Sequence, residues 1–235
     1  MQPWIAQLTG HCGQFRQRTS MCFRVGQGHR RWLTSLPSDF EEALECSRNT
    51  RIDPLAASIS ARLVRQKACD LDCLGQDAAY WSLLAACRAH DMQRSEIGKK
   101  PKHSLYITPL EMRMPPTHDA DMAHGIRWRL RIFTRDGVSA PAPQDERFII
   151  SGSTNAALAA GLVVTRIQEG PSLAAVGRQA VAKAVQVILV SNEYLKFNLK
   201  RQNRLAEQTL VALLHWEQQR EEHKNDIVVL RCLLL

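Results

Sequence analysis

The first 38 residues contain no aspartate, glutamate or lysine, and their charge comes from five arginines. The chain carries a formal net charge of +8 at pH 7, of which the residues after position 38 account for +3. A segment that is rich in Arg, Ser, Thr and Gln and lacks acids is typical of a mitochondrial targeting peptide. We therefore expect residues 1–38 to direct the protein to the mitochondrial matrix. The alternative is a basic arm that stays on the mature protein and binds RNA or a partner.

Long apolar runs and the common catalytic motifs are also missing. The most apolar stretch, Val181–Val190, is interrupted by Lys183 and Gln186, so no membrane span is predicted. No block of 7 to 15 apolar residues follows the first charges, which argues against a secretory signal. The sequence has no phosphate-binding loop, dinucleotide fingerprint, G-x-S-x-G or H-E-x-x-H motif, and we expect no catalysis and no cofactor.

The seven cysteines include no C-x-x-C pair. In a reducing compartment, buried free thiols are the usual outcome. Cys69 and Cys73 share one face of a predicted strand, so a zinc site with Cys46 and Cys87 is an alternative. Zinc motifs usually have tighter paired spacing, and we predict no metal site.

The chain contains an internal repeat, because residues 155–190 align with residues 52–88. Leu158, Ala159 and Ala160 fall on Leu55, Ala56 and Ala57. After a shift of one residue, Leu173, Gly177 and Ala180 fall on Leu71, Gly75 and Ala78. The alignment indicates that the chain arose by duplication.

Each copy is predicted to form strand, helix, strand, helix. The strands are expected at 43–46 and 69–74 in the first copy and at 148–150 and 173–176 in the second. In the second copy Thr154 or Asn155 can cap the first helix, with Leu158, Leu162 and Ile167 facing inward. Val181, Val185, Ile188 and Leu189 are expected to form the apolar side of its second helix.

The two copies are predicted to end differently. In the first, 103–112 and 125–135 read as two strands of a hairpin. In the second, 197–223 reads as an added long helix, and only one strand, 226–233, follows. We therefore expect units at 39–136 and 147–235, joined by a Pro-containing linker at 137–146.

The segments FIISGSTNAALAAGL and LAAVGRQAVAKAV resemble the Alba superfamily, most closely its stage V sporulation protein S branch. The resemblance implies an α/β fold, an α+β sandwich of tandem β-α-β-α-β-β units that form an internal pseudo-dimer, so an obligate homodimer is not required. It also implies RNA or DNA binding through the loop after the first strand, the start of the second helix and the strand hairpin.

Several residues occupy these positions in the resemblance. In the second copy they are Ser153, Thr154 and Asn155 in the loop, with Arg178 and Lys183 on the second helix. In the first copy the matching loop holds Arg48, Asn49 and Arg51. The second helix of the first copy begins Gly75-Gln76-Asp77, which lacks the cation and adds an acid.

A further basic feature does not depend on the family resemblance. It is an arginine ladder, by which we mean Arg127, Arg129 and Arg131. Side chains alternate along a strand, so these three share one face. Three like charges in a row repel unless an anion lies across them, which suggests RNA contact. Four further cations would support that contact: Arg135, Lys99, Lys100 and Lys102. The alternative is an edge strand that its charges protect from aggregation.

A second basic cluster, Lys196, Lys200, Arg201 and Arg204, lies at the start of the expected added helix. The helix dipole disfavours cations there, which suggests a partner. Together these features predict a lineage-specific mitochondrial ribosomal protein that contacts rRNA and other proteins of the assembly. The alternative is a structural subunit of another organellar complex, such as a respiratory assembly, in which the fold makes only protein contacts.

Overall fold

The computed structural model describes residues 43–97, 103–113, 126–136, 147–201, 209–217 and 226–235, all within one compact unit. The predicted targeting segment at 1–38 and the linker at 137–146 lie outside the described residues. So do four of the predicted RNA-binding residues, Lys99, Lys100, Lys102 and Arg204.

The first half consists of two strand–helix units and a pair of long strands. Its elements are β1 (Leu44–Cys46), α1 (Ile52–Gln66), β2 (Ala68–Leu74), α2 (Gln76–Ile97), β3 (His103–Arg113) and β4 (Arg127–Asp136). Gly75 separates β2 from α2 with φ = 89°, a conformation that L residues with side chains rarely adopt. This glycine allows the strand to turn directly into the helix.

The second half repeats this element order. Its elements are β5 (Arg147–Ile150), α4 (Ala156–Thr165), the 3₁₀ turn η3 (Ile167–Glu169), β6 (Ser172–Val176), α5 (Arg178–Arg201), β7 (Leu210–Glu217) and β8 (Ile227–Leu234). Gly177 takes the place of Gly75 between β6 and α5, with φ = 82°. A glycine with positive φ therefore precedes the second helix in both halves.

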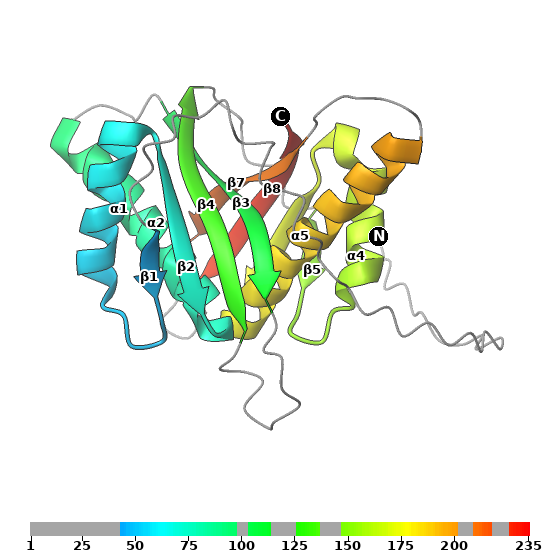
Figure 1. The fold of residues 1–235 in the computed structure, drawn as a ribbon, viewed down its shortest axis with the longest axis horizontal. Helices are drawn as coiled ribbons and strands as arrows, with labels where there is room; N and C mark the ends of the chain where they lie inside the picture. The colour runs from blue at the N-terminus through cyan, green and yellow to red at the C-terminus, as the bar shows by residue number, and fades with distance from the viewer. Residues whose placement is uncertain (1–42, 98–102, 114–125, 137–146, 202–208, 218–225) are drawn as a thin grey trace, which may run out of the picture. The chain divides into compact units, whose positions relative to one another are not determined.

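All eight strands belong to one sheet, in the order β1-β2-β4-β3-β7-β8-β6-β5 (Figure 1). From its own outer edge, each half has the same order: β1-β2-β4-β3 and β5-β6-β8-β7. The halves join where β3 meets β7 antiparallel, with Tyr106 opposite Leu213 and Ile107 opposite Ala212. The described residues thus form a mixed α/β fold with one mixed sheet and four α-helices.

The main core lies between this sheet and the helices. Buried side chains from α1, α2, α4 and α5 belong to the same apolar cluster as alternate residues of the strands, including Trp128, Leu130 and Ile132 of β4. This confirms the alternation predicted for residues 126–132. Helices α2 and α5 also contact each other, so the two halves share the core.

The other face of the sheet has a smaller apolar cluster, formed by Tyr106, Val211 and Leu213. Phe133 packs at its edge, where its ring stacks on Tyr106 with 5.5 Å between the ring centroids. The arginines of β4 point to this second face, because they alternate with Trp128, Leu130 and Ile132.

The prediction of an added helix at 197–223 was wrong. Helix α5 continues to Arg201, and residues 210–217 form β7, so the second half has two final strands and not one. Residues Leu210 to Leu214 are all buried, because β7 is a central strand with core on both faces. A short apolar run of this kind fits a buried strand and a helix equally well by its periodicity.

This correction also changes the position of Lys200 and Arg201. These residues lie in the last turn of α5 and do not open a new helix. A helix C-terminus carries a partial negative charge, so cations are favoured there. Their place in the sequence therefore requires no partner.

The prediction of which residues of α4 face inward was also wrong. Leu158 and Leu162 are 71% and 53% exposed, while Ala160 and Val163 are buried. Of the three residues expected to face inward, Ile167 alone is buried, and it lies in η3. Helix α4 is apolar on nearly every side, so its sequence gave no unique buried stripe.

Candidate nucleic-acid interface

The loops that follow β1 and β5 have the same hydrogen-bonded turn. The amide of Ser47 donates to Thr50 Oγ1 at 2.8 Å, and the amide of Ser151 donates to Thr154 Oγ1 at 2.8 Å. In each loop the threonine amide donates back to the serine carbonyl at 3.1 Å. Both loops lie at the lower edge of the view in Figure 1. The sequence repeat is therefore accompanied by a repeat of local geometry at the loop in which the family resemblance places nucleic-acid contact.

The helices that follow these loops start differently. Asn155 caps α4, because its Oδ1 accepts hydrogen bonds from the amides of Ala157 and Leu158 at 3.0 and 3.2 Å. Arg51 occupies the same position before α1, and its side chain makes no capping hydrogen bond. The loop after β1 thus combines an exposed guanidinium with a helix start that lacks a side-chain cap, and both features add positive potential.

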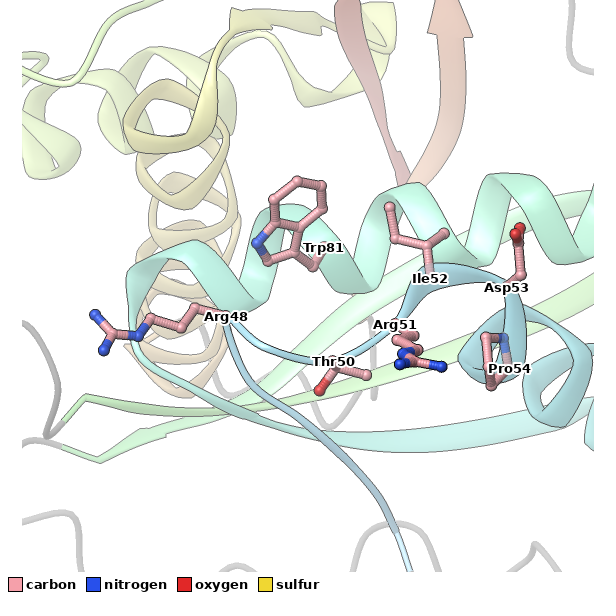
Figure 2. A pocket seen from close by; sticks show the side chains of 7 residues that line it. All are labelled: Arg48, Thr50, Arg51, Ile52, Asp53, Pro54 and Trp81. Carbon is pink, nitrogen blue, oxygen red and sulfur yellow. The ribbon is translucent and has the colours of Figure 1, made fainter.

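A hollow of about 580 Å³ lies beside the loop after β1 (Figure 2). Its lining comes from Arg48, Thr50–Pro54 and Trp81. Trp81 is carried by α2, and Arg48 and Arg51 of the loop are both exposed. The hollow therefore combines an aromatic wall with two cations on a loop whose backbone is fixed by the Ser47–Thr50 hydrogen bonds.

Arg178 reaches this site from the second half of the molecule. Its guanidinium carbon lies 4.8 Å from the centroid of the Trp81 ring, and its Nη1 lies 3.6 Å from Asp77 Oδ2. Both charged side chains are well exposed, so the ion pair adds little stability, about 0–1 kcal/mol. Arg178 was predicted from its place at the start of the second helix, and the structure adds that it contacts Trp81 and Asp77 on α2 of the other half.

The charge around the hollow is positive on balance. Asp53 forms an ion pair with Arg88 of α2 at 3.6 Å, and Asp77 forms one with Arg178. Arg48 and Arg51 add two further cations. Four arginines thus stand against two aspartates, and the local excess of positive charge favours an anionic ligand.

The arginine ladder on β4 already faces carboxylates of this chain. Arg129 donates to both carboxylate oxygens of Asp72 at 2.7 and 2.8 Å. Arg131 donates to both oxygens of Asp70 at 2.6 and 2.8 Å. The sequence reading missed these partners, although Asp70 and Asp72 alternate on their strand as the arginines do on β4. At Arg129 and Arg131, the anion predicted to lie across the ladder is therefore a carboxylate of the neighbouring strand β2.

Burial separates the members of the ladder. Arg131 is buried, whereas Arg127, Arg129 and Arg135 are exposed on β4. The hydrogen bond with Asp72 raises the pKa of Arg129, which therefore keeps its charge. Arg127 of the ladder, and Arg135 near the other end of the strand, remain the positions on β4 best placed to meet a nucleic acid.

The other predicted residues of the second half have local structural roles. Thr154 closes its loop, Asn155 caps α4, and the Ser153 hydroxyl lies 3.0 Å from that of Ser151. Lys183 is half-buried on α5 and donates to Gln186 Oε1 at 2.9 Å. The structure thus brings Arg178 into contact with Trp81, which lines the hollow, whereas these four residues do not line it.

The cysteines do not form a metal site in the part of the chain that the structure describes. Cys46, Cys69, Cys73 and Cys232 are buried free thiols. Burial raises the pKa of Cys73 and brings that of Cys232 to about 12, so these thiols are poor metal ligands and nucleophiles. Within the described ranges, no group of three His, Cys, Asp or Glu side chains is arranged to hold an ion.

No protein-family model and no curated protein matches this chain. No described helix is long and apolar enough to cross a membrane. What the protein does is therefore inferred from the geometry of its own residues.

Proposed function

We propose that this chain is a non-catalytic RNA-binding protein of the mitochondrial matrix. Its most specific form is a lineage-specific ribosomal protein that contacts rRNA within a large assembly. The observation that carries the proposal is the hollow beside β1, which Arg48, Arg51 and Trp81 line. Arg178 lies over the ring of Trp81. Arginine and aromatic side chains in one groove are what RNA-binding surfaces use for phosphates and unstacked bases.

The proposal includes an Alba-like fold for each half. Its support is the order β-α-β-α-β-β, found twice, and the contact of the halves through α2 with α5 and β3 with β7. In this arrangement the chain makes within itself the pairing that members of that family make as dimers. The loop after the first strand and the start of the second helix, which the family uses for nucleic acid, are where the hollow lies.

A second candidate function is a structural subunit of another organellar complex, such as a respiratory assembly. Two observations favour it. The ladder arginines Arg129 and Arg131 are paired with aspartates, which removes part of the basic surface expected for RNA. The outer face of α4 exposes Leu158 and Leu162, which suits contact with a protein.

RNA binding by the full chain tests the proposal, with affinity measured across a range of salt concentrations. A double variant, Arg48→Gln with Arg51→Gln, should reduce the slope of log affinity against log salt by about one to two. The matched control, Arg166→Gln with Lys196→Gln, removes the same charge from the second half and should change the slope much less. Both control side chains are exposed.

Three results would count against the proposal or part of it. Equal loss from both double variants would mean diffuse attraction and no site at the hollow. No binding of any RNA by the wild type would overturn RNA binding and leave the structural-subunit candidate. Sedimentation of organelle extract tests the assembly separately, because comigration with a membrane complex and not with ribosomal subunits would reject the ribosomal setting.

A further inference from the structure

We infer that the hollow beside β1 binds one unpaired RNA nucleotide, with its base against Trp81 and its phosphate at Arg48 and Arg51. This inference rests on the proposed RNA-binding function and specifies its ligand. It predicts that the protein prefers single-stranded or bulged RNA to a continuous duplex, because a paired base inside a helix cannot reach a side-chain ring.

Trp81 is held in a fixed place by its neighbours. The ring of Tyr80 meets its edge, with centroids 5.1 Å apart and planes at 75°, and Arg178 lies over the indole. Tyr80 is itself in contact with Trp216 of β7, at 5.7 Å between centroids. A ring supported in this way loses little freedom when a base stacks on it, which favours binding.

The cations come from the loop that lines the hollow together with Trp81. Arg48 and Arg51 flank Thr50, whose hydroxyl is tied to Ser47, so the loop that presents them is ordered. Figure 2 shows this loop beside the hollow, facing the helix that carries Trp81. The hollow has a volume of about 580 Å³ and is open to solvent.

The second half has no counterpart of this site among its described residues. Trp81 lies six residues after Gly75, and six residues after Gly177 the chain has Lys183. In the loop, Gly152 and Asn155 stand where the first half has Arg48 and Arg51. Within the described residues, this nucleotide site therefore belongs to the first half alone.

The experiment compares the full chain with its Trp81→Leu and Trp81→Phe variants on labelled RNA of one length, as a single strand and as a duplex. Loss of one stacked base should lower single-strand affinity about tenfold in Trp81→Leu. The salt slope should not change, since stacking releases no counterions, and duplex affinity should stay the same. Trp81→Phe keeps an aromatic ring and should retain most of the affinity. Lys183→Gln, at the matching position in the second half, should leave the single-strand preference intact.

The results separate this inference from the function on which it rests. RNA binding by the wild type that is unchanged in Trp81→Leu would overturn the nucleotide site and leave RNA binding standing. Equal losses on single strand and duplex would also overturn it. No binding of either RNA by the wild type would overturn both proposals. Thermal unfolding of each variant shows whether a loss of affinity comes from loss of fold, and Trp81→Phe keeps the inference testable if Trp81→Leu does not fold.

Discussion

The two halves of this chain have the same frame but different surfaces. Ser47 and Thr50 close one loop as Ser151 and Thr154 close the other, and a glycine with positive φ opens the second helix in each half. The exposed side chains beside these loops differ between the halves. The first half has exposed arginines and a tryptophan beside its loop, whereas the loop of the second half carries small polar residues.

The outer helices show the same divergence. Asp53 and Arg65 are exposed on α1, whereas α4 has no charged residue between Ala156 and Thr165. Leu158 and Leu162 are exposed on α4 instead. Both halves have the same element order and contribute to one core, so their interior positions share a constraint that their surfaces do not. The halves therefore inform us about stability where they agree and about function where they differ.

The largest effects should come from positions that agree. Leu130 of β4 and Leu230 of β8 are fully buried and occupy the same place in their half-sheets. Leu130→Ala and Leu230→Ala should each lower the free energy of unfolding by about 3 kcal/mol, through lost burial and the cavity left behind. Denaturant unfolding of each variant measures this.

Because the halves share a core, each leucine variant should unfold in a single transition. Helices α2 and α5 pack together, and β3 pairs with β7. Two separate transitions, with each variant shifting only its own, would show that the halves are independent domains, and the comparison would then apply to two folds and not one.

The next effect concerns the two ion pairs of the ladder. The Arg131 and Asp70 side chains are 9% and 17% exposed, against 44% and 35% for Arg129 and Asp72. Asp70→Ala leaves a buried guanidinium without its carboxylate and should cost about 3 kcal/mol of stability. Asp72→Ala should cost about 1 kcal/mol or less, because water can solvate Arg129.

Urea unfolding of the two aspartate variants provides the measurement, and each serves as the control for the other. The geometry of the pairs is alike, so burial is the variable under test. Equal costs would mean that burial does not determine how much each ion pair contributes to stability.

Much of the frame was predictable from the sequence, because it depends on local signals. The apolar alternation of residues 126–132 and the glycines before α2 and α5 identified strands and helix starts close to where they lie. The predicted strand 226–233 corresponds to β8. These features rest on the period of side-chain placement and on backbone freedom, both of which are visible in single segments.

The errors arose where a segment's state depends on what covers it. Residues 210–214 form a strand because β3 and β8 lie on either side, and nothing within the run says so. Helix α4 could not be oriented because its residues are apolar all round. The partners of Arg129 and Arg131 were missed because strand neighbours were not known, although Asp70 and Asp72 have matching spacing. Trp81 joins the candidate site through tertiary contact alone.

A smaller effect on stability should come from the residues that precede α1 and α4. Each of these residues can be replaced by a residue that changes the capping of its helix. Arg51 and Asn155 both have extended backbones, with φ = −72°, so either residue fits either place. Asn155→Ala should cost about 1 kcal/mol of stability by removing the cap of α4. Arg51→Asn should add about 0.5–1 kcal/mol by capping α1.

The same Arg51→Asn variant should bind RNA more weakly, because it removes one of the two loop cations. Stability and affinity would then move in opposite directions, as expected when a position has been kept for binding at the expense of a cap. Thermal unfolding and RNA affinity of one preparation give both values. A variant that is stabilised and binds RNA as well as the wild type would show that Arg51 has no part in the site.

The smallest effect is expected from a histidine of the second half. His215 lies on β7, and its Nε2 is buried with no hydrogen-bond partner within the described structure. Burial lowers the pKa of His215, and the nearby Arg147 and Arg231 lower it further, against the opposing effect of Glu217. The unfolded chain, with an ordinary histidine pKa of about 6.5, then binds a proton more readily than the folded chain does. Stability should therefore fall as the pH drops through about 6.5 toward the lowered pKa of the folded state, and recover above it. Urea unfolding at several pH values should show a shallower acid-side loss in His215→Gln than in the wild type. The two curves running parallel would mean that protonation of His215 is not what destabilises the protein in acid.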